Sequence, residues 1–470
     1  PIWFVDGTWS ANNLVDNVWG HYYEGIRAAN FYLKETAGLT FDEWKYSDDY
    51  EAIMKEFTNY QYEVRFLRAY FYFELIKRYR NIPFVLDVLA QNEANGVNPE
   101  SYEKIAKFIV DECSDLAQIL PVNYDNFSTK EKGRVTRAAA MALKSRVTLY
   151  MASPLFSEDS EDKWKQAAEA AYDIIKQKTD LGLDLVPYPQ IFNDVNNQKA
   201  EVILYRPTGE SGDFEKANFP IGVEGGKTST CPTQNLMEAY DMKDGTPFVW
   251  NNQSNPYDNR DPRMKYTIVC NEMKWPVDPV EIWEGGTNGL PLQNATTTGY
   301  YLKKYVNNTI SFEAGSTVTK KQHNWVLFRY GEILLNYAEA MINAFHDPNY
   351  KDAVYNMSAR EAVNQIRGRT NISLPGFPSD ITEKDFVKRL KNERRVELAF
   401  EGHRFWDVRR WKELGQTVNI YGVKITKNNE VISYEKFLLE TRAVTDNMYF
   451  YPIPNTERFK NPNLRQNPGW

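Results

Sequence analysis

The chain has 470 residues, more than a single hydrophobic core usually serves, so we expect two intergrown subdomains or a helical array. It is 42% hydrophobic and 25% charged, which is typical of an ordinary globular protein. The net charge of −7, without a basic patch beyond a few arginine pairs, argues against a nucleic-acid-binding protein. Three cysteines, whose redox state the sequence leaves open, and four histidines show no metal-ligand spacing, which argues against a zinc site.

Membrane association is not readable from composition. The sequence contains no run of about 18 apolar residues, so it predicts no membrane-spanning helix. It begins at Pro1 rather than at a methionine. We interpret the chain as a processed product, in which any signal peptide or lipid-anchor cysteine would lie upstream.

The first 180 residues read mainly as helices that are joined by short loops marked by proline. We expect helices over residues 16–37, 63–80, 101–120, 136–152 and 164–178, with a short one before residue 57. Small residues such as Ala69, Ala138 and Ala142 recur where neighbouring helices would approach closely. This texture is typical of tetratricopeptide-like helical hairpins, although an ordinary helix bundle fits the pattern equally well.

Residues 181–324 have a different character, because Gly, Pro, Asn and Thr are frequent there and only short strands are expected, over 201–205 and 266–270. Helices return over 325–345, 358–369 and 383–411, and the tail from residue 449 is expected to be extended. The predicted fold class is therefore mostly α, with tetratricopeptide-like helical hairpins that support an irregular, loop-rich region with short β-strands. We expect a helical part over 1–225 and a second part over 226–470, intertwined as one structural unit.

Residues 393–411 mix charges with large aromatic rings more densely than any other segment. Read as one helix, the segment aligns Glu393, Glu397 and Glu401 at i, i+4 spacing beside arginines. We interpret it as a partly buried ionic network that docks this helix on the rest of the fold. A catalytic pair of glutamates is the alternative reading.

No motif predicts catalysis. Gly226, Lys227 and Thr228 resemble the end of a phosphate-binding loop, but Ile221 stands where that loop needs a glycine. Carboxylates are plentiful, so a glycosidase pair stays open, yet nothing singles one out. We therefore predict no catalytic residue, no metal site and no cofactor.

Aromatic side chains are the remaining candidate site, because 14% of the chain is aromatic and several tryptophans fall in predicted loops. Trp3 and Trp9 lie beside Asn12 in the first loop, and Trp275 and Trp283 lie in the irregular central segment. A flat ring beside an amide or a guanidinium suits a sugar, whose C–H face lies on the ring while the polar groups bind its hydroxyls. For each tryptophan the alternative is burial as a hydrophobic plug.

Several segments resemble the SusD/RagB family of outer-membrane glycan-binding lipoproteins. These segments are PTQNLMEAY at 232–240, RDPR at 260–263, TGYYLKK at 298–304, FRYGEILLNYAEA at 328–340, the charged stretch at 393–411, and a tail that runs from YPIP at 451–454 to QNPGW at 466–470. They occur in the order that the family has, and residues 63–83 extend the similarity into the first half.

The resemblance implies a mostly helical SusD-like fold and a lipid anchor at the outer face of a Gram-negative outer membrane. It also implies that the protein covers a SusC-like TonB-dependent transporter and captures oligosaccharides without cleaving them. In the family the sugar is held by rings, Asn and Arg from an N-terminal loop and the central segment. Trp3, Trp9 and Asn12 resemble the first group, and Trp275 and Trp283 the second.

The functional prediction is thus non-catalytic, cell-surface glycan binding with delivery to the transporter. Two alternatives remain, a glycoside hydrolase on a helical scaffold and a helical-repeat adaptor that binds peptides or proteins.

Overall fold

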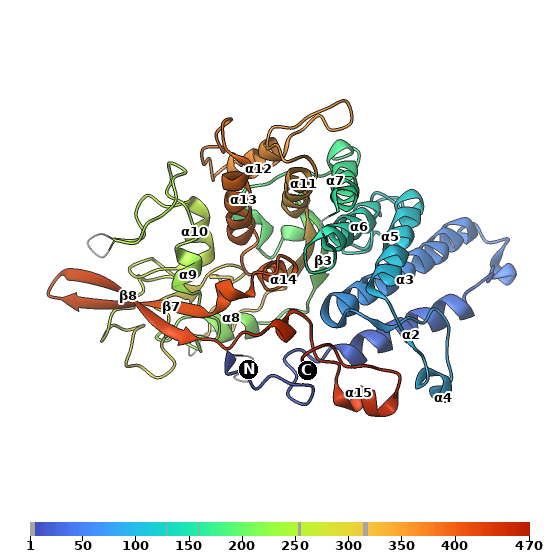
Figure 1. Cartoon of the computed structure of the whole chain (residues 1–470), viewed down its shortest axis with the longest axis horizontal. Coiled ribbons are helices and arrows are strands. Elements are labelled where there is room, and N and C mark those ends of the chain that lie inside the picture. Colours follow the sequence, from blue (N-terminus) through green and yellow to red (C-terminus); the bar gives the residue numbers. More distant parts are fainter. Residues whose placement is uncertain (1–4, 128, 159, 252–254, 314–317) are drawn as a thin grey trace. The chain divides into compact units, whose positions relative to one another are not determined.

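The computed structural model describes residues 5–127, 129–158, 160–251, 255–313 and 318–470 (Figure 1). The chain forms two compact units: unit 1 comprises Pro1–Gly182, Val408–Gly415 and Ala443–Trp470, and unit 2 comprises Leu183–Asp407 and Gln416–Arg442. The first boundary between the two units lies at Gly182. The reason is that strand β3 (Val202–Pro207) pairs antiparallel with β6 (Asn324–Arg329), which places the intervening residues in unit 2.

Unit 1 is built mainly from helices, as the sequence predicts. They are α2 (Trp19–Glu35), α3 (Tyr50–Tyr79), α4 (Gln91–Ala94), α5 (Tyr102–Ile119), α6 (Arg137–Ala152), α7 (Glu161–Lys176) and α15 (Asn455–Lys460). Two-residue strands β1 (Ile82–Pro83) and β2 (Pro99–Glu100) pair antiparallel. Helices α2 and α3, α5 and α6, and α6 and α7 pack as successive neighbours, which gives the helical hairpins (Figure 1).

Local sequence explains the ends and lengths of these helices. Ser101 caps α5, because its side chain accepts a hydrogen bond from the Lys104 backbone N–H at 3.2 Å. Helix α3 is one continuous helix, whereas two were predicted; residues 50–79 contain no Gly or Pro, so nothing interrupts the backbone ladder. Buried alanines on α6 and α7, among them Ala142 and Ala171, allow the close approach that the sequence indicated.

Unit 2 combines short elements with a second helical group. The short elements are β3, α8 (Asp213–Asn218), α9 (Gln234–Met237), α10 (Pro262–Thr267), β4 (Ile268–Val269), β5 (Tyr301–Leu302) and β6. The longer ones are α11 (Tyr330–Phe345), α12 (Ala359–Arg367), α13 (Glu383–Glu397), α14 (His403–Arg410, which ends in unit 1), β7 (Asn419–Asn428) and β8 (Val431–Thr441). Strands β7 and β8 form a hairpin (red arrows in Figure 1) that was not predicted.

Two helix predictions in unit 2 are wrong. Residues 324–329 form strand β6 and not the start of a helix, because this apolar, aromatic run pairs with β3. The stretch over residues 383–411 is not one helix: α13 ends at Glu397 and α14 begins at His403. Phe400 (φ 59°) and Gly402 (φ 80°) adopt left-handed backbone conformations between them, which a continuing α-helix excludes.

Candidate functional site

The first predicted sugar-binding group belongs to unit 1, and Trp9 in this group is covered. Trp9 is 3% exposed, and its ring lies edge-on to Tyr451 at 5.0 Å and to Trp470 at 4.8 Å between centroids. The C-terminal tail thus packs against the N-terminal loop. In this conformation the Trp9 ring holds the loop in place and offers no free face to a ligand. Trp3 lies outside the described residues.

Asn12 in the same loop is exposed. Its side-chain oxygen accepts a hydrogen bond from Asn455 Nδ2 at 2.9 Å, and its backbone N–H donates to Ser10 Oγ at 3.3 Å. Within the described part of the chain, its amide nitrogen has no hydrogen-bond acceptor. Asn12 is therefore a fixed amide that can donate to a ligand.

The second predicted group belongs to unit 2, and Trp275 is also covered. Trp275 is 7% exposed within the hydrophobic core of this unit, and the Lys303 ammonium lies 4.9 Å from its ring centroid. Burial lowers the pKa of Lys303. The Trp275 backbone N–H donates to the Asp278 carbonyl at 2.8 Å, which closes a tight turn. This ring stabilises the turn, and its covered position matches the hydrophobic-plug alternative.

Trp283 is the accessible tryptophan among the members of the predicted set that the structure describes. It is half-buried, packs on the same core, and has the Lys427 ammonium 4.6 Å from its ring centroid. Lys427 comes from β7, far along the chain, so spacing in the sequence could not have indicated it. Nearby in the same loop, Leu290 and Leu292 are 44% and 42% exposed, which gives the loop an apolar surface.

The loop that carries Trp283 is fixed by its own hydrogen bonds. Asn288 accepts from the Glu281 backbone N–H at 2.8 Å and donates to the Ile221 carbonyl at 2.6 Å. The Glu284 backbone N–H donates to the Ile425 carbonyl of β7 at 2.9 Å. A ring held on a rigid loop loses little conformational entropy when a ligand binds. The loop over residues 281–292 is thus the part of unit 2 best arranged to present a ring and polar groups together.

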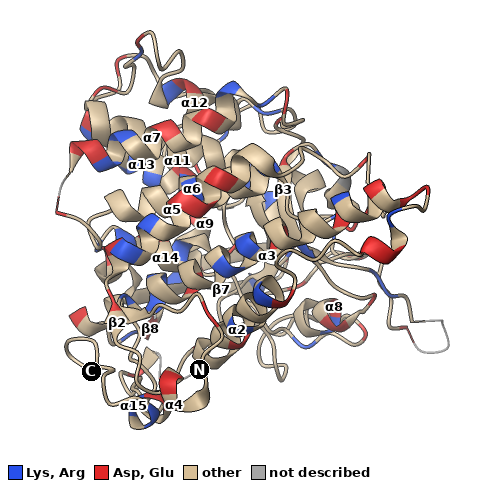
Figure 2. Ribbon diagram, turned by 90° about the vertical axis from the view of Figure 1, so that its right-hand side faces the viewer, with Lys and Arg blue, Asp and Glu red and all other residues tan. Residues whose placement is uncertain are grey.

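The charged stretch from Glu393 forms a buried ionic network, which we name the glutamate network (Figure 2 shows the basic and acidic residues along the helices). Its acidic members are Glu201, Asp261, Glu393, Glu397 and Glu401, and its basic members are Arg263, Lys304, Arg329, Arg367 and Arg369. Arg263 Nη1 lies 2.8 Å from Glu397 Oε2, and Arg329 Nη1 lies 2.8 Å from Glu397 Oε1. Every acid in the network is paired with a base, which accounts for the glutamates without a reaction.

The network also explains the titration of its acids. Burial on its own would raise the pKa of Glu397, but the guanidinium groups of Arg369, Arg329 and Arg263 hold it well below its ordinary value. Burial lowers the pKa of Lys304 to about 8, although the carboxylate of Glu401 partly offsets this. Glu401 also belongs to the network, although it lies in the break between α13 and α14 and not in α13 itself. The structural interpretation of this stretch is confirmed, while its single-helix geometry is not.

The described residues form neither a metal-ion cluster nor a membrane-spanning helix. Within the described ranges, no group of three or more His, Cys, Asp and Glu side chains could hold a metal ion. No helix in the same part of the chain is long and apolar enough to cross a membrane.

Comparison with protein families shows to which family the chain belongs. Residues 191–470, more than half of the chain, match the model of the SusD family. The chain belongs to the SusD family. Residues 4–149 match a second SusD-like model, which is described as "Starch-binding associating with outer membrane".

Individual SusD-like relatives are distant in sequence. SusD-like protein P2 of Formosa agariphila is 23% identical over 98% of this chain and 81% of its own length. SusD-like protein P38 of the same organism is 30% identical, but over only 31% of this chain and 24% of its own length.

Solved SusD-like structures match the whole fold. A SusD-like protein from Bacteroides fragilis gives a TM-score of 0.81 at 26% identity, covering 100% of this chain and 89% of the other. A SusD-like carbohydrate-binding protein from the same species gives a TM-score of 0.80 at 26% identity, covering 99% of this chain and 88% of the other. The mostly helical fold class that the sequence predicted is therefore confirmed.

Proposed function

We propose that this SusD-family protein binds oligosaccharides at the cell surface without cleaving them and passes them to a TonB-dependent, SusC-like transporter in the outer membrane. The observation that carries the proposal is the whole-chain similarity to the carbohydrate-binding Bacteroides fragilis protein. The family model over residues 4–149 supports the association with starch and with the outer membrane. A lipid anchor would hold the protein at the cell surface.

The candidate ligand-binding set is Trp3, Trp9, Asn12, Trp275 and Trp283, with distinct roles for its members. In unit 2, Trp283 would provide the ring face on which a pyranose lies, and in unit 1, Asn12 would separately offer a hydrogen-bond donor to a sugar hydroxyl. The covered rings of Trp9 and Trp275 would hold the two loops in shape. A ligand at Trp283 would share the ring with the Lys427 ammonium, which can itself donate to sugar hydroxyls.

Calorimetric titration with a panel of neutral and acidic oligosaccharides tests the binding step. We expect heat with at least one glycan and no release of reducing ends from any of them. Reducing-end release would favour the hydrolase alternative, and the absence of binding to every glycan would leave the peptide adaptor. Co-purification of a transporter from outer membranes tests delivery separately, since it does not require that the sugar be known.

A further inference from the structure

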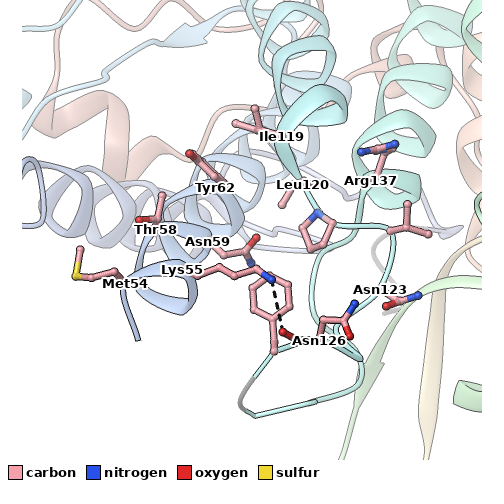
Figure 3. A pocket seen from close by; sticks show the side chains of 13 residues that line it. Met54, Lys55, Thr58, Asn59, Tyr62, Ile119, Leu120, Asn123, Asn126 and Arg137 are labelled. Carbon is pink, nitrogen blue, oxygen red and sulfur yellow. Dashed lines mark hydrogen bonds between the residues drawn. The ribbon is translucent and has the colours of Figure 1, made fainter. Parts of the chain in front are cut away.

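We propose that unit 1 contains a second saccharide site, separate from Trp283 and selective for sugars that carry a carboxylate, such as uronic acids. The site is a pocket between α3, the end of α5 and the loop that follows it (Figure 3). Its volume is about 670 Å³, within the roughly 300–1,000 Å³ typical of sites for small ligands. Only the saccharide nature of the ligand rests on the proposed function; the preference for an acid rests on the pocket.

Asn59 supplies the most specific group in the pocket. It is 4% exposed, and its Nδ2 donates to Glu63 Oε1 at 2.8 Å and to the Tyr124 hydroxyl at 2.9 Å. The Tyr124 hydroxyl donates to the Val135 carbonyl, so it must accept from Asn59, which fixes the orientation of the amide. The Asn59 carbonyl oxygen therefore lines the cavity, and no group in the described part of the chain donates to it. An acceptor at the cavity wall that is held in place and has no donor favours a ligand that brings one, such as a hydroxyl.

The wall behind Asn59 is rigid and its carboxylates are occupied. Arg134 forms ion pairs with Glu63 and with Glu56, and its guanidinium lies 4.1 Å from the Tyr124 ring centroid. Both carboxylates are thus paired with the same guanidinium. The remaining charge that lines the cavity is positive, because the lining contains Lys55 and Arg137 and no acidic residue.

Arg137 supplies the free cation. Its Nε is buried without a hydrogen-bond partner, and its guanidinium forms no ion pair with any described residue. It also lines a second hollow of about 270 Å³ together with Lys144, which likewise has no ion pair in the described ranges. Arg137 is partly exposed where it lines the pocket, and a bound carboxylate would pair with its charge. This residue is the reason for expecting an acidic sugar rather than a neutral one.

The rest of the lining suits a sugar ring. Tyr62 and Thr58 on α3, together with Asn123 and Asn126 in the loop, place hydroxyl and amide groups around the opening (Figure 3). Ile119, which is 43% exposed, gives apolar surface for the C–H face of a pyranose. The Lys55 ammonium lies 4.5 Å from the centroid of the Phe127 ring and donates a hydrogen bond to the Asn126 carbonyl at 3.5 Å. Lys55 therefore closes one side of the pocket. In the bound sugar, a hydroxyl would donate a hydrogen bond to Asn59 while the carboxylate would form an ion pair with Arg137.

Titration of the intact protein with trigalacturonate and with neutral galactotriose tests the site. We expect trigalacturonate to bind at least tenfold more tightly than galactotriose. In the Arg137→Gln variant, which keeps a polar side chain of similar reach, the affinity for trigalacturonate should fall at least tenfold. Added salt should weaken trigalacturonate binding to the wild type but not to this variant. The Asn59→Asp variant, which adds a negative charge to a side chain of the same shape, should also weaken the binding of trigalacturonate. Circular dichroism checks that each variant is folded.

The control variant is Lys107→Gln, which removes an exposed cation of α5 outside the pocket lining and should leave trigalacturonate affinity unchanged. Equal affinity of the two sugars, unchanged binding in folded Arg137→Gln, or loss of trigalacturonate binding in Trp283→Ala alone would each overturn the second site. The last of these outcomes would still support glycan binding at Trp283. If trigalacturonate does not bind the wild type at all, the second site is wrong, and binding of neutral glycans still decides the proposed function.

Discussion

Arg329 and Glu397 lie 2.8 Å apart inside unit 2, and their side chains are 1% and 0% exposed. The same guanidinium also reaches Glu201 at 2.7 Å and Glu401 at 2.7 Å. One arginine therefore pairs with three glutamates, of which Glu397 and Glu401 lie four residues apart and Glu201 comes from a distant segment. Removal of this cation leaves negative charges buried close to one another.

The first prediction concerns this arginine. Arg329→Met should lower the free energy of unfolding by about 3–5 kcal/mol, because it leaves buried carboxylates without their main partner. Lys107→Met is the matched control: it breaks the exposed pair with Asp111, which spans 2.6 Å, and should cost less than about 1 kcal/mol. Denaturant unfolding measures both. A similar small cost for the two variants would contradict a structural role for the network.

The second prediction concerns acid. Burial alone would raise the pKa values of Glu393, Glu397 and Glu401, but their basic partners hold all three below the ordinary value of 4.5. The unfolded chain therefore binds more protons than the folded chain at low pH. Their contribution to stability is complete above about pH 4.5 and is lost as the pH falls toward the lower pKa values of the folded state.

Urea unfolding at a series of pH values below 5 checks this expectation. The free energy of unfolding of the wild type should fall steadily as the pH decreases. Glu397→Gln should be less stable at pH 7 and should show a shallower decline, because one of the responsible carboxylates is missing. A variant that declines as steeply as the wild type would show that Glu397 does not contribute to acid sensitivity.

The sequence predicted much of the helical scaffold because helix signals are local. The Ser101 cap, the alanine-rich faces of α6 and α7, and the loop-rich character of the central segment could all be read from neighbouring residues. The spacing of Glu393 and Glu397 likewise indicated an ionic network. The basic partners in this network, Arg263 and Arg329, could not be identified from the sequence, because contacts between distant segments leave no local pattern.

The candidate site was harder to predict for the same reason. A tryptophan in a loop has the same sequence whether the fold covers it or leaves it open. Trp9 is covered by Tyr451 and Trp470, which come from the other end of the chain. Lys427 beside Trp283 belongs to a hairpin that the sequence analysis did not identify.

The third prediction separates a ligand platform from a hydrophobic plug. Trp9→Ala should lower the free energy of unfolding by about 3–5 kcal/mol, because it empties a buried position between two rings. Trp283→Ala should cost less stability and should lower glycan affinity at least tenfold, since its ring is half-exposed on a fixed loop. Calorimetry and denaturant unfolding measure the two effects. Full glycan affinity in Trp283→Ala would remove this residue from the site.

The fourth prediction tests whether the shape of the Trp283 loop matters for binding. A Cβ atom at Gly289 would lie 2.2 Å from the Trp283 carbonyl oxygen and 2.6 Å from that of Ile282, so the backbone of Gly289→Ala must shift. We expect this shift to lower glycan affinity at least tenfold while the helices of unit 1 keep their stability. Gly20→Ala is the control, because it lies in α2 with nothing within 4 Å of the new Cβ and should gain about 0.5–1 kcal/mol from its helix propensity. Calorimetry and tryptophan fluorescence report on affinity and on the loop. If Gly289→Ala changes the fluorescence but binds glycans as tightly as the wild type, the ligand does not depend on this loop, and the site must be sought on other residues.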